Sequence, residues 1–422
     1  MAALTLLLVP VLVLQGKPAG DYPGAAIDVH LRKNQYLAAL RAAEKEAKAD
    51  TEGMFVDRLG LLQSFVGLER EALVTFDSMG AEPLAPVASS PIDDATALDA
   101  IPAIVEAAKG RRIVILNESH HVSRHRAFAA ELARALRKEG FDTFAAETFA
   151  DVEGTAKRGY PDHSTGYYSQ DPVFGELVRT VLELGYRTVA YEATFHAPQP
   201  DQDQRMRIND REIQQSANLK ERVFDAFPGA RLFVYVGYSH ATENWVDKGG
   251  PKELAWMAAR LASLTGLDPL TVDQTGAMPR SEPRFESPHR RRALDAGKLD
   301  RPRVFRQGDG TFFVAGTYAG KVDMQVFHPP LGESKGRPDW LARGRRAVDL
   351  PAEAVKALDP ERTSLVQSFR ASESEDAIPA DQFVVRGRSE RPVLLLAPGR
   401  YRIVVQDEAG AERARVENVP VE

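Results

Sequence analysis

Residues 113–121 read IVILNESHH and carry the feature that decides the fold, a short apolar run that ends in polar, titratable side chains. Comparable β-branched or aromatic runs recur downstream, each gap leaving room for a helix: TFAA (143–146), TVAY (188–191), LFVYV (232–236), LTV (270–272) and the weaker VDMQVF (322–327). Strands that alternate with helices predict an α/β fold, with a mainly parallel sheet that carries helices on both faces.

Four of these runs are followed at once by residues that exchange protons or bind ions. They are Glu118, His120 and His121, then Glu147, then Glu192, and finally Tyr238 and His240. Ligands of open parallel sheets bind outside the carboxyl ends of the strands, so we expect these side chains to meet in one cleft. Close-set carboxylates and imidazoles shift one another's pKa toward values useful in acid–base catalysis. The same oxygen and nitrogen atoms also suit a divalent cation.

Two further patterns concern the predicted helices. In REIQQSANL (211–219), Arg211, Gln215 and Asn218 form a polar face at spacings of four and three. An arginine that faces the cleft would supply a fixed positive charge for a carboxylate or a developing oxyanion. His121 and His125, four residues apart at a helix start, share one face and have a spacing that can hold a metal.

The ends of the chain differ from this central part. Apolar residues at threes and fours between 30 and 80 predict a helical N-terminal cap, and alternating runs near the C-terminus predict a small antiparallel β unit. We expect the chain to be divided into a signal peptide at 1–19, a helical region at 20–92, the α/β domain at 93–340, a linker with a helix at 341–380 and the β unit at 381–422.

Composition narrows the classes of function. With 54 basic and 60 acidic residues the chain has a net charge of −6, which gives no electrostatic footprint for nucleic acid. It has no cysteine, so any metal must be held by His, carboxylate or water. The apolar run at 2–14 is shorter than the about 20 residues of a membrane span and matches a signal peptide; the alternative is a buried strand. We therefore expect an exported protein, periplasmic or secreted, with no stable membrane span in the mature chain.

The strand-end residues resemble a known superfamily, that of the erythromycin esterases, the ChaN-type haem-binding uptake proteins and the Tiki/TraB proteins. ILNESHH resembles its Gly-Glu-x-His opening with Asn117 in place of Gly, and the other likenesses are AAETF at Glu147, REIQQSANL at Arg211, Glu212 and Asn218, and VGYSH at Gly237 and His240. The resemblance covers roughly residues 95–275. It implies an α/β fold in which esterase-like members use His as a general base aided by Glu and Arg. Tiki-like members are metal-dependent peptidases, and ChaN-like members bind haem or iron.

Two functions fit these observations. The favoured one is a hydrolase acting on an ester or amide of a small molecule or peptide, in which His121 or His120 deprotonates water, with metal assistance left open. Its expected catalytic residues are Glu118, His120, His121, Glu147, Glu192, Arg211 and His240. The alternative is a non-catalytic protein that binds haem or a divalent metal. Its expected metal ligands are Glu118, His121, His125, Glu147 and His240, with Tyr238 as a cofactor-binding residue.

Overall fold

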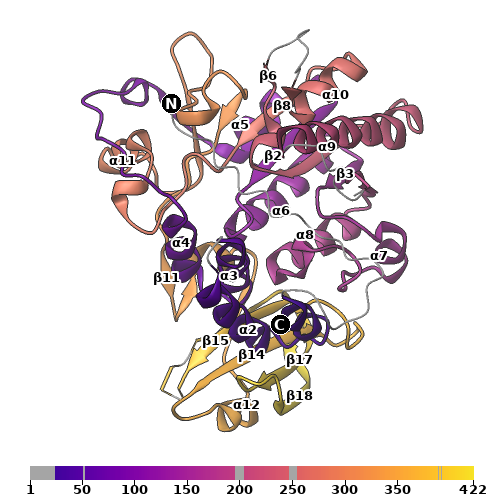
Figure 1. The fold of residues 1–422 in the computed structure, drawn as a ribbon, viewed down its shortest axis with the longest axis vertical. Helices are drawn as coiled ribbons and strands as arrows, with labels where there is room; N and C mark the ends of the chain where they lie inside the picture. The colour runs from indigo at the N-terminus through magenta and orange to yellow at the C-terminus, as the bar shows by residue number, and fades with distance from the viewer. Residues whose placement is uncertain (1–23, 51–52, 195–203, 247–253, 388, 391) are drawn as a thin grey trace.

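A six-stranded sheet with all strands parallel lies at the centre of the fold (Figure 1). The computed structural model describes residues 24–50, 53–194, 204–246, 254–387, 389–390 and 392–422. The expected signal peptide therefore lies outside the described residues. In order across the sheet the strands are β10 (Met324–Gln325), β8 (Leu270–Asp273), β2 (Ile113–Glu118), β5 (Leu232–Gly237), β3 (Thr143–Ala146) and β4 (Arg187–Ala190).

Both faces of this sheet are buried, which explains why its strands read as unbroken apolar runs. Every residue of β2 and β5 is buried. Along β2, Val114 and Leu116 enter one hydrophobic core, whereas Ile113 and Ile115 enter the core on the opposite face. The predicted α/β class with a parallel sheet is confirmed.

Helices pack against each of these two cores. One face is covered by α5 (Ala100–Ala107), α6 (Ser123–Lys138) and α8 (Pro172–Glu183). The other face is covered by α9 (Gln204–Leu219), the π-helical turn η3 (Lys220–Asp225) and α10 (Met257–Thr265). The coverage of both faces agrees with the prediction.

The helical cap consists of four short helices: α1 (Ala25–Leu31), α2 (Tyr36–Ala49), α3 (Met54–Phe65) and α4 (Glu69–Ser78). Figure 1 shows α2 beside the C-terminal sheet, with α3 and α4 above α2 and to the left of α8. The cap contacts both of these parts. Leu61 of α3 belongs to the main core of the α/β part, while Leu365 of the C-terminal sheet belongs to the core of the cap. The Tyr36 hydroxyl donates to the carbonyl oxygen of Gln170 at 2.8 Å.

The C-terminal unit is an antiparallel sheet, as predicted, but it is larger than the pattern indicated. Its strand order is β15 (Asp381–Arg386), β14 (Thr363–Arg370), β17 (Gly399–Gln406) and β18 (Glu412–Val421). Strands β14 and β18 were missed. In β14 the polar Ser364, Gln367 and Ser368 are buried among the apolar residues, which hides the pattern. β18 lies at the sheet edge with charged side chains facing solvent, as edge strands commonly do. The helix expected before this unit is α12 (Ala352–Ala357).

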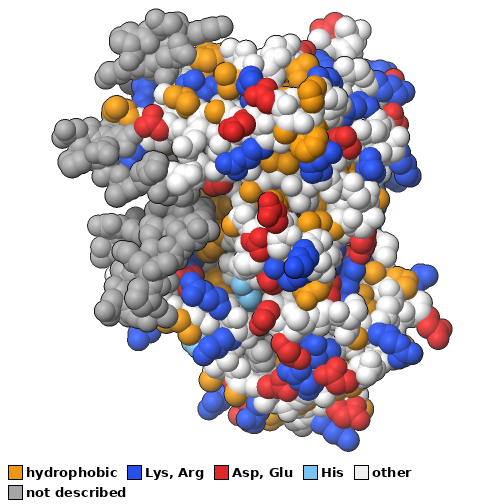
Figure 2. All heavy atoms as spheres, turned by 90° about the vertical axis from the view of Figure 1, so that its right-hand side faces the viewer, with side chains coloured by type: hydrophobic (Ala, Val, Ile, Leu, Met, Phe, Trp, Pro, Cys, Tyr) orange, Lys and Arg blue, Asp and Glu red, His pale blue; other side chains and the backbone are white. Residues whose placement is uncertain are grey.

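The other elements are short. They comprise α7 (Val152–Arg158), α11 (Pro288–Asp295), and the strand pairs β1 (Thr96–Asp99) with β9 (Arg303–Arg306), β6 (Trp245–Val246) with β7 (Leu254–Ala255), β11 (Glu333–Ser334) with β12 (Arg337–Pro338), and β13 (Arg346–Val348) with β16 (Leu394–Leu396). Among the helices of the described residues, none combines the length and apolar character needed to cross a bilayer. Acidic and basic side chains are interspersed over the face shown in Figure 2.

A buried ion pair joins the C-terminal unit to α8, and its loss should be costly. Arg179 is fully buried, donates from Nε to Glu373 Oε1 at 2.7 Å and also donates to the carbonyl of Ile378. Arg179→Met leaves the Glu373 charge buried and unpaired, so we expect a loss of about 3–5 kcal/mol in the free energy of unfolding. The double variant Arg179→Met/Glu373→Met should regain most of it. Urea denaturation measures both, and Glu183→Gln at an exposed pair is the control, expected within about 1 kcal/mol of wild type.

Candidate active site

The register of the sheet brings the strand-end residues to one edge. Glu118, the last residue of β2, lies directly opposite Gly237, the last residue of β5. On the other side of β5, Ala146 lies opposite Tyr235, so Glu147 emerges from β3 beside the end of β5. β4 follows β3 in register, and Glu192 emerges two residues after it ends. Residues far apart in the sequence thus meet at the carboxyl edge of the sheet.

Arg126 organises the first of two ionic clusters at this edge. It is fully buried and donates from Nε to Glu118 Oε2 at 2.9 Å and from Nη2 to Glu118 Oε1 at 3.0 Å. It also donates from Nη1 to Asp171 Oδ2 at 2.6 Å and from Nη2 to the carbonyl of His120 at 2.7 Å. Its guanidinium lies 5.3 Å from the ring centroid of Phe174. The arginine therefore fixes both the Glu118 carboxylate and the backbone that bears His120.

The Glu118 carboxylate in turn orients the imidazole of His120. Burial alone would raise the pKa of Glu118, but the charge of Arg126 and the hydrogen bond from His120 lower it to about 2. Ionised Glu118 accepts from Nδ1 of His120 at 2.8 Å, which leaves a lone pair on Nε2 of the neutral ring. The ring stacks on Tyr168 at 3.9 Å between centroids and meets the edge of Tyr238 at 5.2 Å. His120 is thus held in one tautomer and one orientation.

Arg211 of α9 organises the second cluster. It donates from Nε to Glu192 Oε1 at 2.9 Å, and from Nη2 to both Glu192 Oε2 and Glu147 Oε1 at 2.6 Å. Gln215, one turn further along the helix, donates to Glu192 at 3.0 Å. Burial opposes ionisation of Glu147, but the charges of His240 and Arg211 hold the pKa of that carboxyl well below its usual range. The polar helix face predicted from Arg211 and Gln215 therefore faces the sheet edge.

His240 completes the second cluster on the short turn after β5. Its Nε2 lies 3.1 Å from Nη1 of Arg211, and its Nδ1 lies 2.7 Å from Oε1 of the fully buried Glu212. Because a guanidinium is only a donor, Nε2 of the neutral ring is the acceptor, and in that form the proton sits on Nδ1, facing Glu212. Burial lowers the pKa of His240, but the charges of Glu212 and Glu147 outweigh it and raise that pKa above its ordinary value.

Gly237 is the point at which the two clusters meet. Its N–H donates to Glu147 Oε2 at 2.6 Å. A Cβ at this position would lie 2.6 Å from Nε2 of His120 and 2.9 Å from Oε2 of Glu147. His120 and Glu147 therefore pack so closely against Gly237 that a methyl group would not fit, and only glycine is accommodated without a shift. Tyr238, the next residue, has a φ of 39°, an uncommon conformation for a bulky residue that turns the chain sharply after the strand.

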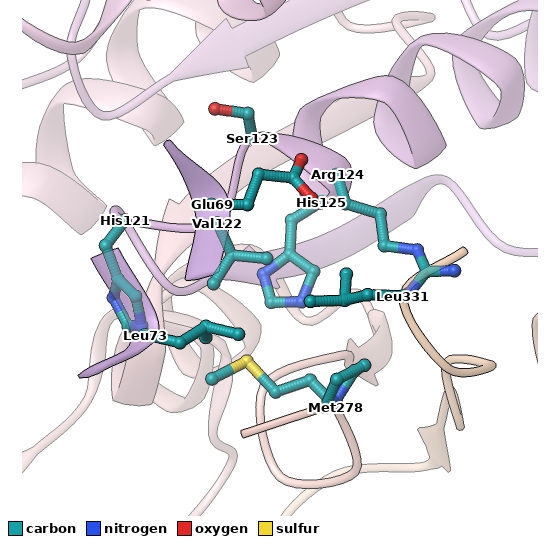
Figure 3. Close-up of a pocket in the computed structure, with 10 residues that line it drawn as sticks. Glu69, Leu73, His121, Val122, Ser123, Arg124, His125, Met278 and Leu331 are labelled. Carbon is teal, nitrogen blue, oxygen red and sulfur yellow. The ribbon is translucent and has the colours of Figure 1, made fainter. Parts of the chain in front are cut away.

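His121 and His125 do not join these clusters. His121 stacks on Phe76 of α4 at 3.5 Å between centroids, and Nδ1 of His125 accepts from the backbone N–H of Ser119 at 3.1 Å. Both rings line a separate hollow of about 20 Å³, enough for about one water molecule. Figure 3 shows Val122 between the two rings in this view. Successive residues leave the strand end in different directions, so the adjacent His120 and His121 reach different surroundings.

The metal ligands predicted from the sequence are consequently not brought together. The predicted set, Glu118, His121, His125, Glu147 and His240, is divided between the two clusters and the hollow. Within the described ranges, no group of three or more His, Asp or Glu residues is arranged to hold a metal ion. The expected carboxylates are instead neutralised by Arg126 and Arg211. The predicted cofactor residue, Tyr238, packs against His120.

Sequence reasoning missed the residues that fix His120. Arg126 and Asp171 are buried partners of the same ionic cluster, and Tyr168 supplies the ring on which His120 stacks. Charged residues of an amphipathic helix usually face solvent, so Arg126 gave no signal by itself. The signal that was present is Glu118: a carboxylate at the end of a fully buried strand requires a buried counter-charge.

No family model matches the chain, and no curated protein matches it. Solved structures to which it is similar include three bacterial proteins. The type III effector HopBA1 shares 14% identity, with a TM-score of 0.31, over 47% of this chain and 87% of that one. RRSP, a MARTX toxin effector domain from Vibrio vulnificus, shares 16%, with a TM-score of 0.29, over 57% and 55%. The C-terminal region of Pasteurella multocida toxin shares 11%, with a TM-score of 0.32, over 90% and 54%.

These findings correct the expected family. The assignment to the superfamily of erythromycin esterases, ChaN and Tiki/TraB proteins is wrong, because no family model supports it and the similar structures are bacterial toxin effectors. The motifs that suggested it are short, and polar residues at strand ends are common to parallel sheets that bind ligands. The C-terminal region of the Pasteurella toxin has a thiol-protease-like catalytic triad. At these TM-scores the likenesses carry no argument about function.

His125 should make the protein sensitive to acid below the range of an ordinary imidazole. Burial lowers the pKa of His125 from 6.5 to about 3, so between these values the unfolded chain binds a proton that the folded chain does not. The contribution of His125 to the free energy of unfolding is fully present above pH 6.5. As the pH falls below that value, the contribution decreases by up to about 1.4 kcal/mol per pH unit. His125→Asn keeps an acceptor for the Ser119 N–H without titrating.

The measurement is the free energy of unfolding of both proteins by urea between pH 7 and pH 5. Burial raises the pKa of Asp57 to about 6 and those of Glu69 and Glu243 to about 7, so these carboxyls add stability as the pH falls. They do so in wild type and variant alike. The free energy of unfolding should therefore rise less steeply with pH in His125→Asn than in the wild type. Identical slopes in the two proteins would contradict the assignment of a neutral, buried His125.

Proposed function

We propose that this protein is a hydrolase that attacks an ester or amide bond with a water molecule activated by His120. The observation that carries the proposal is the chain of contacts from Arg126 through Glu118 to Nδ1 of His120. A carboxylate that holds Nδ1–H of an imidazole leaves Nε2 free to accept a proton, which is the arrangement of a general base. The side chain of His120 is 15% exposed, so water reaches it.

Arg211 is the group best placed to stabilise the negative charge that develops on the carbonyl oxygen. Its charge is permanent, and the two carboxylates that hold it leave it little freedom to move. A positive group that is fixed before the reaction stabilises an oxyanion without the cost of reorientation. His240 positions Arg211 from the other side, at 3.1 Å. The side chain of Arg211 is 10% exposed.

Glu147 and Glu192 have positioning roles in this proposal. Both accept hydrogen bonds from Arg211, and Glu147 also accepts from the N–H of Gly237. The pKa of Glu147 is lowered by its neighbours, so this carboxyl is a poor proton donor near neutral pH. Glu147 therefore acts on the substrate through the arginine that it orients, rather than through its own oxygens.

Replacing His120 should abolish hydrolysis without unfolding the protein. Loss of a general base typically costs 10²–10⁴-fold, so we expect His120→Gln to lower kcat/KM for p-nitrophenyl butyrate by at least about 100-fold. Glu118→Gln should also lower it, because the amide no longer selects the Nδ1–H tautomer. Release of p-nitrophenol measures the rate, and a thermal melt checks that each variant is folded.

His289→Gln is the matched control. His289 lies on α11, where its Nδ1 is 2.7 Å from the Ser90 hydroxyl, and it contacts neither ionic cluster. This variant should hydrolyse the ester at the wild-type rate. A folded His120→Gln protein that retained full activity would refute the proposed general base.

A further inference from the structure

The hydrolysis described above needs a second group, one that gives a proton to the departing oxygen or nitrogen. Three carboxylates of the site, Glu118, Glu147 and Glu192, each accept hydrogen bonds from an arginine, and the pKa values of Glu118 and Glu147 are lowered. The proton of His240 sits on Nδ1 and faces Glu212, while its Nε2 accepts from Arg211. These carboxylates are therefore poor proton donors, and both ring nitrogens of His240 already face a partner.

The cap supplies a carboxyl group, that of Asp57, which does not pair with an arginine of the site. Asp57 lies on α3, four residues before Leu61 and eight before Phe65, so the three share one face of that helix. Leu61 packs into the core of the α/β part, and the Phe65 ring lies 5.8 Å from the guanidinium of Arg126. Asp57 lies one turn before Leu61 on this face, so it is directed toward the α/β part.

The surroundings of Asp57 agree with this placement. The residue is 6% exposed, and its charge is felt by His120 and by Tyr167, Tyr168 and Tyr238. Its neighbour Arg58 pairs with Asp28 instead. In the described part of the chain, no hydrogen bond or ion pair to the Asp57 carboxyl is seen. Burial raises the pKa of Asp57 to about 6, an increase that positive charge on His120 limits.

We propose that Asp57 is the proton donor to the leaving group in the hydrolysis proposed above, on which this inference rests. His120 takes a proton from water as the new C–O bond forms, giving a tetrahedral oxyanion beside Arg211. When the carbonyl re-forms, the bond to the leaving group breaks and the departing atom takes the proton of the Asp57 carboxyl. His120 then returns the proton it accepted to Asp57, directly or through solvent, so that one water and one ester give one acid and one alcohol.

Leaving groups of different basicity test this role. A p-nitrophenolate departs without a proton, whereas an alkoxide or an anilide needs one. We expect Asp57→Asn to lower kcat/KM by about 100-fold for ethyl butyrate and for N-butyryl-p-nitroaniline, and by less than about threefold for p-nitrophenyl butyrate. With the first two substrates, the wild-type rate should fall as the pH rises through about 6, and this fall should be absent from the residual rate of Asp57→Asn.

The controls separate a chemical role from a structural one. Glu71→Gln removes an exposed carboxylate from the same cap and should leave all three rates unchanged. Asp57→Glu, which keeps the acid, should restore part of the lost rate. An equal loss on all three substrates, or no loss on any, would overturn the role of Asp57 alone. A wild-type protein that hydrolyses none of them would overturn the proposed function and this inference together.

Discussion

The site depends on one buried cation, the guanidinium of Arg126. Its donors bind the Glu118 and Asp171 carboxylates and the carbonyl of His120, so one group fixes the end of β2, the turn that follows it and the start of α8. Two carboxylates could not remain ionised in this apolar setting without it, because an unpaired buried charge is costly. The low pKa of Glu118 follows from that pairing, and the orientation of His120 follows from Glu118.

A second buried arginine repeats the arrangement on the other half of the sheet edge. Arg211 binds Glu147 and Glu192 as Arg126 binds Glu118 and Asp171. The two clusters approach each other at Gly237, where the lack of a side chain lets His120 and Glu147 pack close to the backbone. The carboxylates of both clusters pair with Arg126 or Arg211. The groups available to exchange protons are therefore those that do not pair with an arginine, above all His120.

The helical cap completes this edge of the sheet. Its apolar face joins the main core through Leu61, and Phe76 stacks on His121. The sequence predicted the cap as helical but indicated no chemistry in it, because Asp57 is one acid among many on amphipathic helices. Its burial arises only when α3 packs against the α/β part. Long-range packing, which no local pattern records, turns an ordinary surface acid into a buried carboxyl with a raised pKa.

The sequence by itself determined the α/β class, because the central strands β2 and β5 are buried on both faces and so appear as unbroken apolar runs. It also placed Glu118, Glu147 and His240 just at or past strand ends, since parallel strands end at one edge. Only the tertiary structure decided which neighbours each side chain meets. His120 and His121 are adjacent in sequence, yet one faces Glu118 and the other faces Phe76. Side-chain direction at a turn depends on backbone angles and on distant partners, and neither is written in the local pattern.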